Sequence, residues 1–369
     1  VGEYFNNFYK NYLSFELTKP QKKVLKEIRN DFASNQQMIR LLQGDVGSGK
    51  TVVALLSILI SIDNNYQSCL VAPTEILAFQ HFKNFKDKFE NLGLVVKVLT
   101  GSTKSSERKI LLNDLKNGSI NLLIGTHAIF EQNVIFNNLG YAVIDEQHRF
   151  GVKQRSKIWE KNNPPPHVLI MTATPIPRTL TMSLYGDLDL SIIDELPPGR
   201  KDVITVHRKD KNRLKVFGFI RDQIKQGRQI YIVYPLIEES KKMDLKYLED
   251  GLESITREFD KENYSIGVMH GRMRSSNKDI EMNNFLNGKI DILISTTVIE
   301  VGVNVPNASV MIIENAERFG LSQLHQLRGR VGRGKYDSYC VLMTNDKISE
   351  DAKIRIDAMV NSNDGFKIS

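Results

Sequence analysis

The stretch that decides the fold is Leu41-Leu42-Gln43-Gly44-Asp45-Val46-Gly47-Ser48-Gly49-Lys50-Thr51. Its glycines, lysine and threonine have the spacing of a phosphate-binding loop, G-x-x-x-x-G-K-[ST]. We expect a short strand over 38–42 and a helix over 51–62, which is the context that such a loop requires. A flexible glycine turn is the plain alternative, but it does not explain Gly-Lys-Thr between a strand and a helix. The stretch therefore predicts binding of ATP or a close relative.

The spacing assigns a role to each part of this loop. Glycines let the backbone curl tightly enough for its N–H groups to face phosphate oxygens. Lys50 supplies a point charge for the β- and γ-phosphates, and the Thr51 hydroxyl is suited to bind Mg²⁺. The positive end of the following helix lies at the phosphates. The expected nucleotide-binding residues are Gly44, Asp45, Val46, Gly47, Ser48, Gly49, Lys50 and Thr51.

The composition indicates a globular protein with room for two domains. Of its 369 residues, 41% are hydrophobic and 25% are charged, and the net charge of +7 fits a polyanionic partner without establishing one. The longest apolar stretch, 52–62, is too short to span a bilayer, and the first residues are too polar for a signal peptide. Cys69 and Cys340 offer neither a disulfide framework nor a metal cluster, so we expect buried, reduced thiols in a cytoplasmic protein. The sequence begins at Val1 and is expected to be a fragment.

Most of the chain alternates between strand-like and helix-like segments. A helix is expected from Lys19, with Thr18 as its N-cap and Pro20 in its first turn, whereas residues 1–17 have no clear period. Such alternation, with near-continuous apolar strands, predicts parallel sheets covered on both faces. The expected strands are 38–43, 68–72, 95–99, 121–125, 141–145, 168–172, 203–207, 230–234, 265–269, 291–295, 309–313 and 338–343.

The alternation is interrupted at Glu195-Leu196-Pro197-Pro198-Gly199-Arg200, which is typical of a linker. The expected fold class is therefore α/β, with two tandem lobes that are each a mostly parallel sheet flanked by helices. Because only the first lobe has a phosphate loop, we expect the nucleotide site in the cleft between the lobes. The expected divisions are a lead-in over 1–17, lobe 1 over 18–194, a linker over 195–202, lobe 2 over 203–345 and the start of a C-terminal region over 346–369.

An acidic pair follows the apolar strand 141–144, in Asp145-Glu146-Gln147-His148. It lies at the carboxyl end of a strand, where open α/β sheets bind ligands. Beside a phosphate loop, Asp145 is suited to hold Mg²⁺ through water, and Glu146 to polarise the water that attacks the γ-phosphate. The alternative is that the pair caps the next helix. Because Lys50 lies in the same lobe, the catalytic interpretation of the acidic pair is favoured over the helix cap.

Two more stretches contain side chains suited to phosphate chemistry. Thr172-Ala173-Thr174-Pro175 follows strand 168–171, and its hydroxyls could bond to the acidic stretch; a turn is the alternative. The stretch 326–333 (QLRGRVGR) places three arginines after an expected helix over 322–327. An arginine fork matches phosphate oxygens and can act as an arginine finger. The alternative is a basic loop that binds a nucleic acid backbone.

In combination, these motifs resemble those of superfamily 2 helicases. The stretches that resemble motifs I, II, III and VI are, in that order, 44–51, 145–148, 172–174 and 326–333. The stretches that resemble the Q motif and motifs Ia, Ib, Ic and V are, in that order, 18–21, 73–78, 100–102, 125–128 and 296–304. Longer stretches look like those of RecG-type DNA branch-migration helicases, at 145–155, 171–180, 235–240 and 313–333. The motor of the transcription-repair coupling factor is similar over 171–180 and is the nearest competitor.

The resemblance implies two RecA-like lobes that close on ATP and Mg²⁺ and translocate on duplex DNA. Fork regression and Holliday-junction migration would follow, in a bacterial cytoplasmic, nucleoid-associated monomer with no membrane contact. Gln21 would bind adenine, Gly302 and Asn304 would contribute to the nucleotide site, and Gln326, Arg330 and Arg333 would act in catalysis, the two arginines on the γ-phosphate. His148, Thr172 and Thr174 would couple hydrolysis to movement. The implied DNA-binding residues are Pro73, Thr74, Thr100, Gly101, Ser102, Thr126, His127, His270, Arg272, Thr296 and Thr297.

The sequence departs from the family pattern at three points. Asn304 stands where the family more often has Asp, and this sequence lacks the family's N-terminal wedge domain and the hairpin that follows the motor. The alternative function is therefore a remnant that binds ATP and DNA without coupling them. RNA unwinding is disfavoured because the acidic motif is not of the DEAD type.

The remaining candidates have plainer expectations. The histidines His81, His127, His148, His270 and His325 match no zinc spacing, so structural or motif roles are expected. Phe319 is expected to pack in the core rather than stack on a base.

Overall fold

Each half of the chain folds around its own parallel sheet. The computed structural model separates into two units, Val1–Pro197 and Pro198–Ser369. It describes residues 2–34, 36–146, 157–173, 188–197, 201–235, 251–260, 262–296, 303–332, 334 and 336–362.

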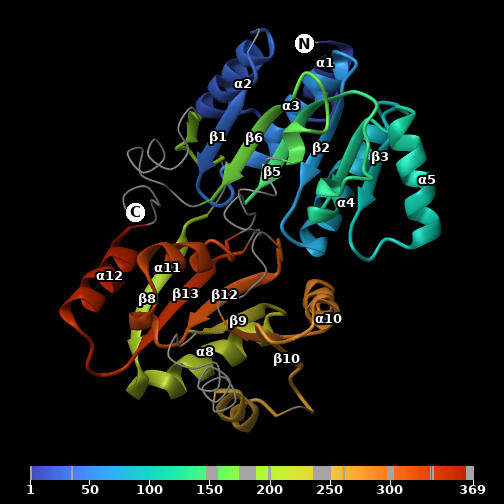
Figure 1. Ribbon diagram of the computed structural model, residues 1–369. Helices are drawn as coiled ribbons and strands as arrows, with labels where there is room; N and C mark the ends of the chain where they lie inside the picture. Colours follow the sequence, from blue (N-terminus) through green and yellow to red (C-terminus); the bar gives the residue numbers. More distant parts are fainter. Residues whose placement is uncertain are drawn as a thin grey trace. The chain divides into compact units, whose positions relative to one another are not determined.

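The first unit contains a seven-stranded sheet in the order β3-β4-β2-β5-β6-β1-β7, and every neighbouring pair is parallel (Figure 1). The strands are β1 Ile39–Gly44, β2 Gln67–Val71, β3 Val96–Leu99, β4 Leu122–Gly125, β5 Leu139–Asp145, β6 His167–Thr172 and β7 Asp189–Ile193. The first six confirm the expected strands. β7 was not expected, and it extends the sheet beside the strand that leads into the phosphate loop.

Residues 157–159 of this unit are helical, and five α-helices and one short 3₁₀ helix lie wholly within the described residues. They are α1 Glu3–Asn11, α2 Lys19–Phe32, α3 Lys50–Asp63, α4 Glu75–Glu90, α5 Ser105–Lys116 and η1 His127–Phe130. α2 starts as expected, because the Thr18 hydroxyl accepts the Gln21 N–H and Pro20 lies in the first turn. α1 was not expected. Its first turn is held by the Asp63 carboxylate, which accepts N–H groups of Gly2 and Tyr4 at 2.7 and 2.9 Å.

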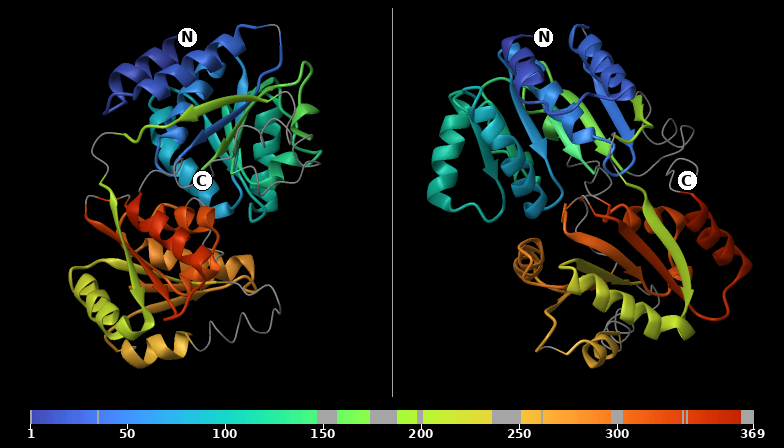
Figure 2. Two further views of the ribbon diagram at one scale, coloured as in Figure 1. Left: turned by 90° about the vertical axis from the view of Figure 1, so that its left-hand side faces the viewer. Right: turned by 180° about the vertical axis from the view of Figure 1, so that it is seen from behind.

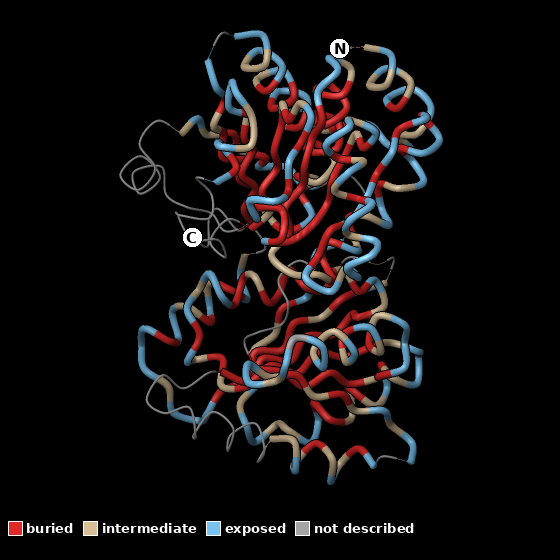
Figure 3. Tube along the Cα trace, turned by 45° about the vertical axis from the view of Figure 1, so that its right-hand side comes forward, coloured by how far each residue is buried: buried red, intermediate tan, exposed pale blue. Residues whose placement is uncertain are grey.

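The two faces of this sheet are buried in separate clusters, so successive strand residues alternate between them. Leu42 packs with α2, α3 and α4, whereas Leu41 packs in the second cluster, with α5 and η1. The strands are therefore buried on both sides, as their continuous apolar sequences predict, and they form the red interior of this unit in Figure 3.

The second unit has six parallel strands in the order β10-β11-β9-β12-β13-β8. They are β8 Val203–Lys209, β9 Gln229–Tyr234, β10 Ile266–Met269, β11 Ile292–Thr296, β12 Ala308–Ile313 and β13 Ser338–Thr344, and all six confirm the expected strands. The helices that lie wholly within the described residues are η3 Asp210–Asn212, α8 Arg213–Lys225, α10 Ser275–Leu286, η4 Ala316–Arg318, α11 Leu321–Arg328 and α12 Glu350–Asn361, and residues 251–258 are helical as well. α8 packs along one sheet face, as its yellow-green ribbon shows in Figure 2. Phe319 is 1% exposed, which confirms its place in the core.

Both cysteines are free and fully buried, as expected. Burial raises the pKa of the Cys69 thiol and of the Cys340 thiol to about 12, so both remain protonated at neutral pH. Among the described residues, no helix has both the length and the apolar character needed to cross a bilayer.

Candidate functional site

The nucleotide-site candidates of the first unit meet at one edge of its sheet. β5, β6 and β1 are neighbours in that order, with Asp145 beside Met171 and Thr172 beside Gln43. All three strands are parallel, so their carboxyl ends lie together. The phosphate loop after β1, the acidic pair after β5 and Thr172 at the end of β6 therefore share the edge where open α/β sheets bind ligands.

The phosphate loop has the backbone that its glycines predict. Gly47 and Gly49 adopt φ values of 78° and 88°, which are left-handed conformations that favour glycine. The Asp45 carboxylate accepts the N–H of Val46 at 2.6 Å, and the N–H of Ser48 donates to the Asp45 carbonyl at 3.1 Å. These bonds close the loop directly before α3, whose positive end then faces an anion at the loop.

Lys50 is buried at the first residue of α3 and points back into the loop. Its Nζ donates to the carbonyl oxygens of Gly44 and Asp45, at 2.7 and 2.9 Å. An ammonium group carries three donors, so a phosphate oxygen can replace either carbonyl without leaving the charge uncompensated. Thr51 follows in the same turn and is half-buried. This arrangement suits a lysine that neutralises a nucleotide phosphate beside a hydroxyl that can bind a cation.

Gln21 connects α2 to the phosphate loop through both ends of its amide. The amide oxygen accepts the Thr18 N–H at 2.9 Å, and the amide nitrogen donates to the Ser48 carbonyl at 2.8 Å. The side chain is 1% exposed. Its expected contact with adenine stays a prediction, and in this structure the amide supports the loop.

The two acidic residues differ in their settings. Asp145 ends β5, and its Oδ2 lies 3.0 Å from Nε2 of His81 on α4. Glu146 is buried and has φ of 52°, a left-handed conformation that costs a non-glycine residue roughly 1 kcal/mol or more. Its N–H is held by the Met171 carbonyl at 3.0 Å. Strain of this kind gathers at functional sites, where the surrounding structure fixes a side chain in one direction.

The residues at this edge fit a nucleotide-bound magnesium ion. Mg²⁺ is usually held by one or two carboxylates, waters and the substrate's phosphates rather than by a cage of protein ligands. The donor set of Asp145 and Thr51 matches this pattern, and no cluster of three His, Cys, Asp or Glu residues suited to a metal occurs in the described part of the chain.

The coupling residues are only partly described. Thr172 is 3% exposed at the end of β6, between the strands that carry the loop and the acidic pair. Thr174 and His148 lie outside the described residues.

The expected DNA-binding residues of the first unit follow the carboxyl ends of β2, β3 and β4. Thr74 is the N-cap of α4, and its hydroxyl accepts the Leu77 N–H at 3.3 Å. Gly101, Ser102 and His127 are exposed. Pro73 is half-buried, whereas Thr100 and Thr126 are buried, so their side chains are not presented to solvent.

The candidates of the second unit also lie at or after strand ends. Thr296 ends β11 and is buried, while His270 and the exposed Arg272 follow β10. Asn304 is half-buried before β12. Gly302, Thr297 and Arg333 lie outside the described residues.

The arginine-rich stretch is described in part, and its two described arginines have different surroundings. Gln326 lies half-buried on α11, and Arg330 follows the helix at 5% exposure. Arg328 instead packs inward, where its guanidinium donates to the carbonyl oxygens of Met359 and Ser362 at 3.0 and 2.7 Å. Arg328 therefore fastens α11 to the end of α12, because these orphan carbonyls at the helix terminus need donors.

Two polar residues near the nucleotide edge were not predicted as site residues. His81 contacts Asp145, and Glu75 accepts both the N–H and the hydroxyl of Ser102, at 3.0 and 2.5 Å. Neither pairing could be predicted, because each partner is distant in sequence and no local spacing indicates the contact.

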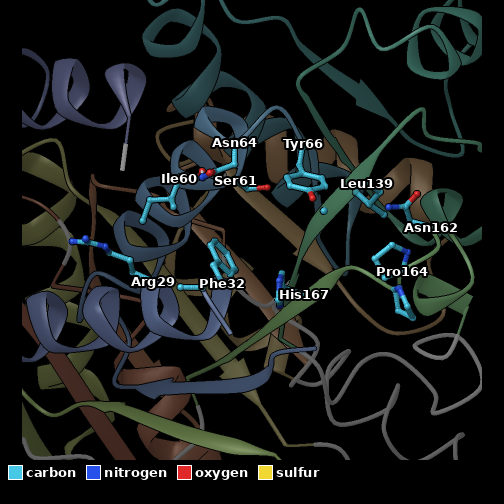
Figure 4. Close-up of a pocket in the computed structure, with 13 residues that line it drawn as sticks. Arg29, Phe32, Ile60, Ser61, Asn64, Tyr66, Leu139, Asn162, Pro164 and His167 are labelled. Atoms are coloured by element: carbon cyan, nitrogen blue, oxygen red, sulfur yellow. The ribbon is translucent and has the colours of Figure 1, made fainter. Parts of the chain in front are cut away.

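A cavity of about 410 Å³ lies at the opposite edge of the first sheet (Figure 4). His167 and Leu139, which begin β6 and β5, line it together with the rings of Phe32 and Tyr66. The Tyr66 ring lies against Gly140, where a Cβ would come within 2.5 Å of it. The cavity contains none of the predicted nucleotide or DNA residues, so it is separate from the site described above.

Comparison with known proteins agrees with this geometry. A DEAD/DEAH box helicase model matches residues 18–183, and a helicase conserved C-terminal domain model matches residues 212–335. The ATP-dependent DNA helicase RecG of Synechocystis sp. is 51% identical over 100% of this chain and 44% of its own length. RecG of Bacillus subtilis is 49% identical over 97% of this chain and 52% of its own length. This chain is a RecG-type superfamily 2 helicase core.

Solved structures give the same relationship. A structure of RecG bound to a three-way DNA junction superposes with a TM-score of 0.86 at 44% identity, over 98% of this chain and 47% of that one. The Mycobacterium smegmatis helicase Lhr superposes with a TM-score of 0.68 at 16% identity, over 98% of this chain and 50% of that one, which shows the shared two-lobe RecA-like fold alone. The RecG-type core therefore spans about half the length of the curated relatives it matches.

Proposed function

We propose that this chain is the motor of an ATP-dependent DNA helicase that translocates on duplex DNA. The observation that carries the proposal is the meeting of a closed phosphate loop, a buried Lys50 and the Asp145-Glu146 pair at one sheet edge. Relatives named as ATP-dependent DNA helicases at about half identity support it. The proposed working parts are lobe 1 over 18–194 and lobe 2 over 203–345, joined by 195–202.

ATP hydrolysis would proceed by attack of water on the γ-phosphorus with loss of ADP. Glu146 accepts the proton of the attacking water, and its fixed backbone keeps the carboxylate in one direction. Lys50 neutralises the β- and γ-phosphates, while Arg330 and Arg333 stabilise the charge of the transferring phosphoryl group, assisted by Gln326. Thr51 and Asp145 would hold Mg²⁺, which neutralises phosphate charge when bound.

The proposed DNA partner is duplex and branched DNA, held mainly through its phosphates. Backbone and hydroxyl groups at the half-buried Thr74 and at the exposed Gly101 and Ser102 can contact phosphates without selecting a sequence. His270, Arg272 and the region of Thr296 to Asn304 would contribute from lobe 2. The RecG structure on a three-way junction supports a branched substrate, on which the whole protein would regress forks and migrate Holliday junctions as a monomer at the bacterial nucleoid.

A fork-regression assay with the whole protein that contains this chain tests the proposal. Labelled oligonucleotides forming a model fork are incubated with ATP, and the products are separated by gel electrophoresis. The expected result is an ATP-dependent regressed product that is absent with a non-hydrolysable analogue and with Lys50→Ala. ATP hydrolysis without a regressed or migrated product would contradict coupling and favour the alternative, a protein in which ATP and DNA binding are not coupled to movement.

A further inference from the structure

One helix of the first unit contacts both the proposed DNA side and the nucleotide side. α4 begins after its N-cap Thr74 and carries His81 on its second turn. His81 is 4% exposed, and its Nε2 lies 3.0 Å from Oδ2 of Asp145. The sequence predicts only a structural or motif role for His81, yet its imidazole touches the carboxylate proposed to hold the cation.

The chemistry of this contact fixes its direction. An ionised carboxylate only accepts hydrogen bonds, so Nε2 of His81 is the donor, and the bond orients one oxygen of Asp145. Nδ1 of His81 is buried and has no hydrogen-bond partner among the described residues. Burying a polar atom without a partner costs roughly 1–3 kcal/mol. We infer that the hydrogen bond from Nε2 to Asp145 offsets this cost and fixes the position of the imidazole.

The first turn of α4 is tied to the loop after β3. Both carboxylate oxygens of Glu75 accept from Ser102, one from its N–H and one from its hydroxyl. The Ser102 hydroxyl also lies 3.0 Å from the Thr100 hydroxyl. A phosphate that binds the exposed Gly101 and Ser102 must therefore act on Glu75 and on the start of α4.

We propose that His81 is a positioning residue that couples DNA contact at the start of α4 to the orientation of Asp145. The proposal rests on the function proposed above. α4 is one continuous helix, and its rise of about 1.5 Å per residue puts His81 roughly 9 Å from Glu75 along the axis. A displacement of its first turn by a DNA phosphate is thus transmitted to the His81–Asp145 bond, and through it to the bound nucleotide.

The proposal is tested by the linkage factor, which is the ratio of the nucleotide affinity with DNA to the nucleotide affinity without DNA. If DNA raises the affinity for a nucleotide by some factor, the nucleotide raises the affinity for DNA by the same factor. Fluorescence titration of the whole protein with a labelled, non-hydrolysable ATP analogue and Mg²⁺, with and without a duplex, gives that factor. This measurement requires no turnover, so it separates positioning from the chemical step.

His81→Leu removes the donor and keeps the side-chain volume, and His81→Asn supplies a shorter polar side chain that does not reach Asp145. Both variants are expected to lower the linkage factor at least about fivefold. His81→Gln places an amide N–H near the former Nε2 and is expected to restore most of it. The matched control is Phe85→Leu, one turn further along the same helix with its ring 6.0 Å from His81, which is expected to leave the linkage unchanged.

Two results would overturn the proposal. Wild-type linkage in both His81→Leu and His81→Asn would show that Asp145 is oriented without this bond. An equal loss in Phe85→Leu would show that any disturbance of α4 is sufficient. If the wild-type protein itself shows neither linkage nor DNA-stimulated hydrolysis, then the proposed function fails, and His81 loses the role that depends on it.

Discussion

The side-chain amide of Gln21 donates a hydrogen bond of 2.8 Å to the carbonyl of Ser48, and so it joins α2 to the middle of the phosphate loop. The same amide lies where a side chain on Gly49 would be, since a Cβ there would come within 2.2 Å of its nitrogen. Gly49 is therefore required for two reasons, its φ of 88° and the space that Gln21 occupies. The loop's shape depends on a residue far outside its own motif.

Replacing Gln21 by Ala is expected to lower the free energy of unfolding by about 1–2 kcal/mol, because the capping box of α2 and the bond to Ser48 are both lost. Urea unfolding measures this loss. Lys22→Ala, at an exposed neighbouring position of α2, is the control and is expected to be nearly neutral. An unfolding curve of Gln21→Ala that matches the control would disprove the supporting role.

Glu146→Gln is expected to bind ATP normally and to hydrolyse it about 10²- to 10⁴-fold more slowly, because an amide keeps the shape but cannot accept the proton. Nucleotide titration and steady-state hydrolysis provide the two measurements. Glu160→Gln, an exposed residue of the same unit, is the control for loss of one charge. Hydrolysis within threefold of wild type would exclude Glu146 as the base.

Arg330→Ala and Arg328→Ala are expected to fail in different ways. Arg330→Ala should lower turnover by about 10³-fold or more, with ATP affinity reduced much less, as for an arginine that acts on transition-state charge. Arg328→Ala should instead lower the free energy of unfolding, by roughly 1–3 kcal/mol, because Met359 and Ser362 lose their donor. Thermal unfolding and hydrolysis distinguish the two. Lost stability with normal turnover in Arg330→Ala, together with lost turnover and normal stability in Arg328→Ala, would contradict both roles.

Because of His167, the free energy of unfolding is expected to fall as the pH falls below about 6.5, the ordinary pKa of a histidine. Burial lowers the pKa of His167 despite the nearby Asp31 carboxylate, and Nδ1 accepts the Met38 N–H at 3.0 Å. The unfolded state therefore binds a proton more readily than the folded state. As a result, the contribution of His167 to the free energy of unfolding is constant above the ordinary pKa and declines as the pH falls from that value to the lower pKa of the folded state.

His167→Asn keeps an acceptor for Met38 and does not titrate, so its urea midpoint should fall less than that of wild type between pH 7.5 and 5.5. Burial also lowers the pKa of His207, so some dependence on pH should remain in the variant. Equal slopes for the two proteins would show that His167 does not contribute.

Much of the fold could be predicted because it is encoded locally. The buried strands are continuous apolar runs between glycine-rich or polar turns, and all twelve expected strands are present. β7 escaped prediction because Asp189–Ile193 is short, partly polar and close to the prolines of the expected linker. α1 escaped because its many asparagines have low helix propensity, although its rings stack at helical spacing, Phe5 on Tyr9 and Phe8 on Tyr12.

The candidate site divides in the same way. The phosphate loop, the acidic pair and the cap of α2 each consist of residues close together in sequence, so motif spacing is sufficient to find each of them. The contacts of His81 with Asp145 and of Arg328 with the end of α12 join residues that are distant in sequence. Only the parallel order of the strands and the packing of the helices bring these partners together.

Duplex DNA is expected to stimulate ATP hydrolysis by these two lobes alone. The most direct test is the steady-state ATPase rate of the 369-residue chain without DNA, with linear duplex and with a model fork. The three rates are compared at one stated salt concentration, since phosphate contacts are sensitive to salt. We predict that duplex and fork both raise the rate, and that Lys50→Ala abolishes it. A nucleotide-bound chain whose rate is the same with and without DNA would contradict the claim.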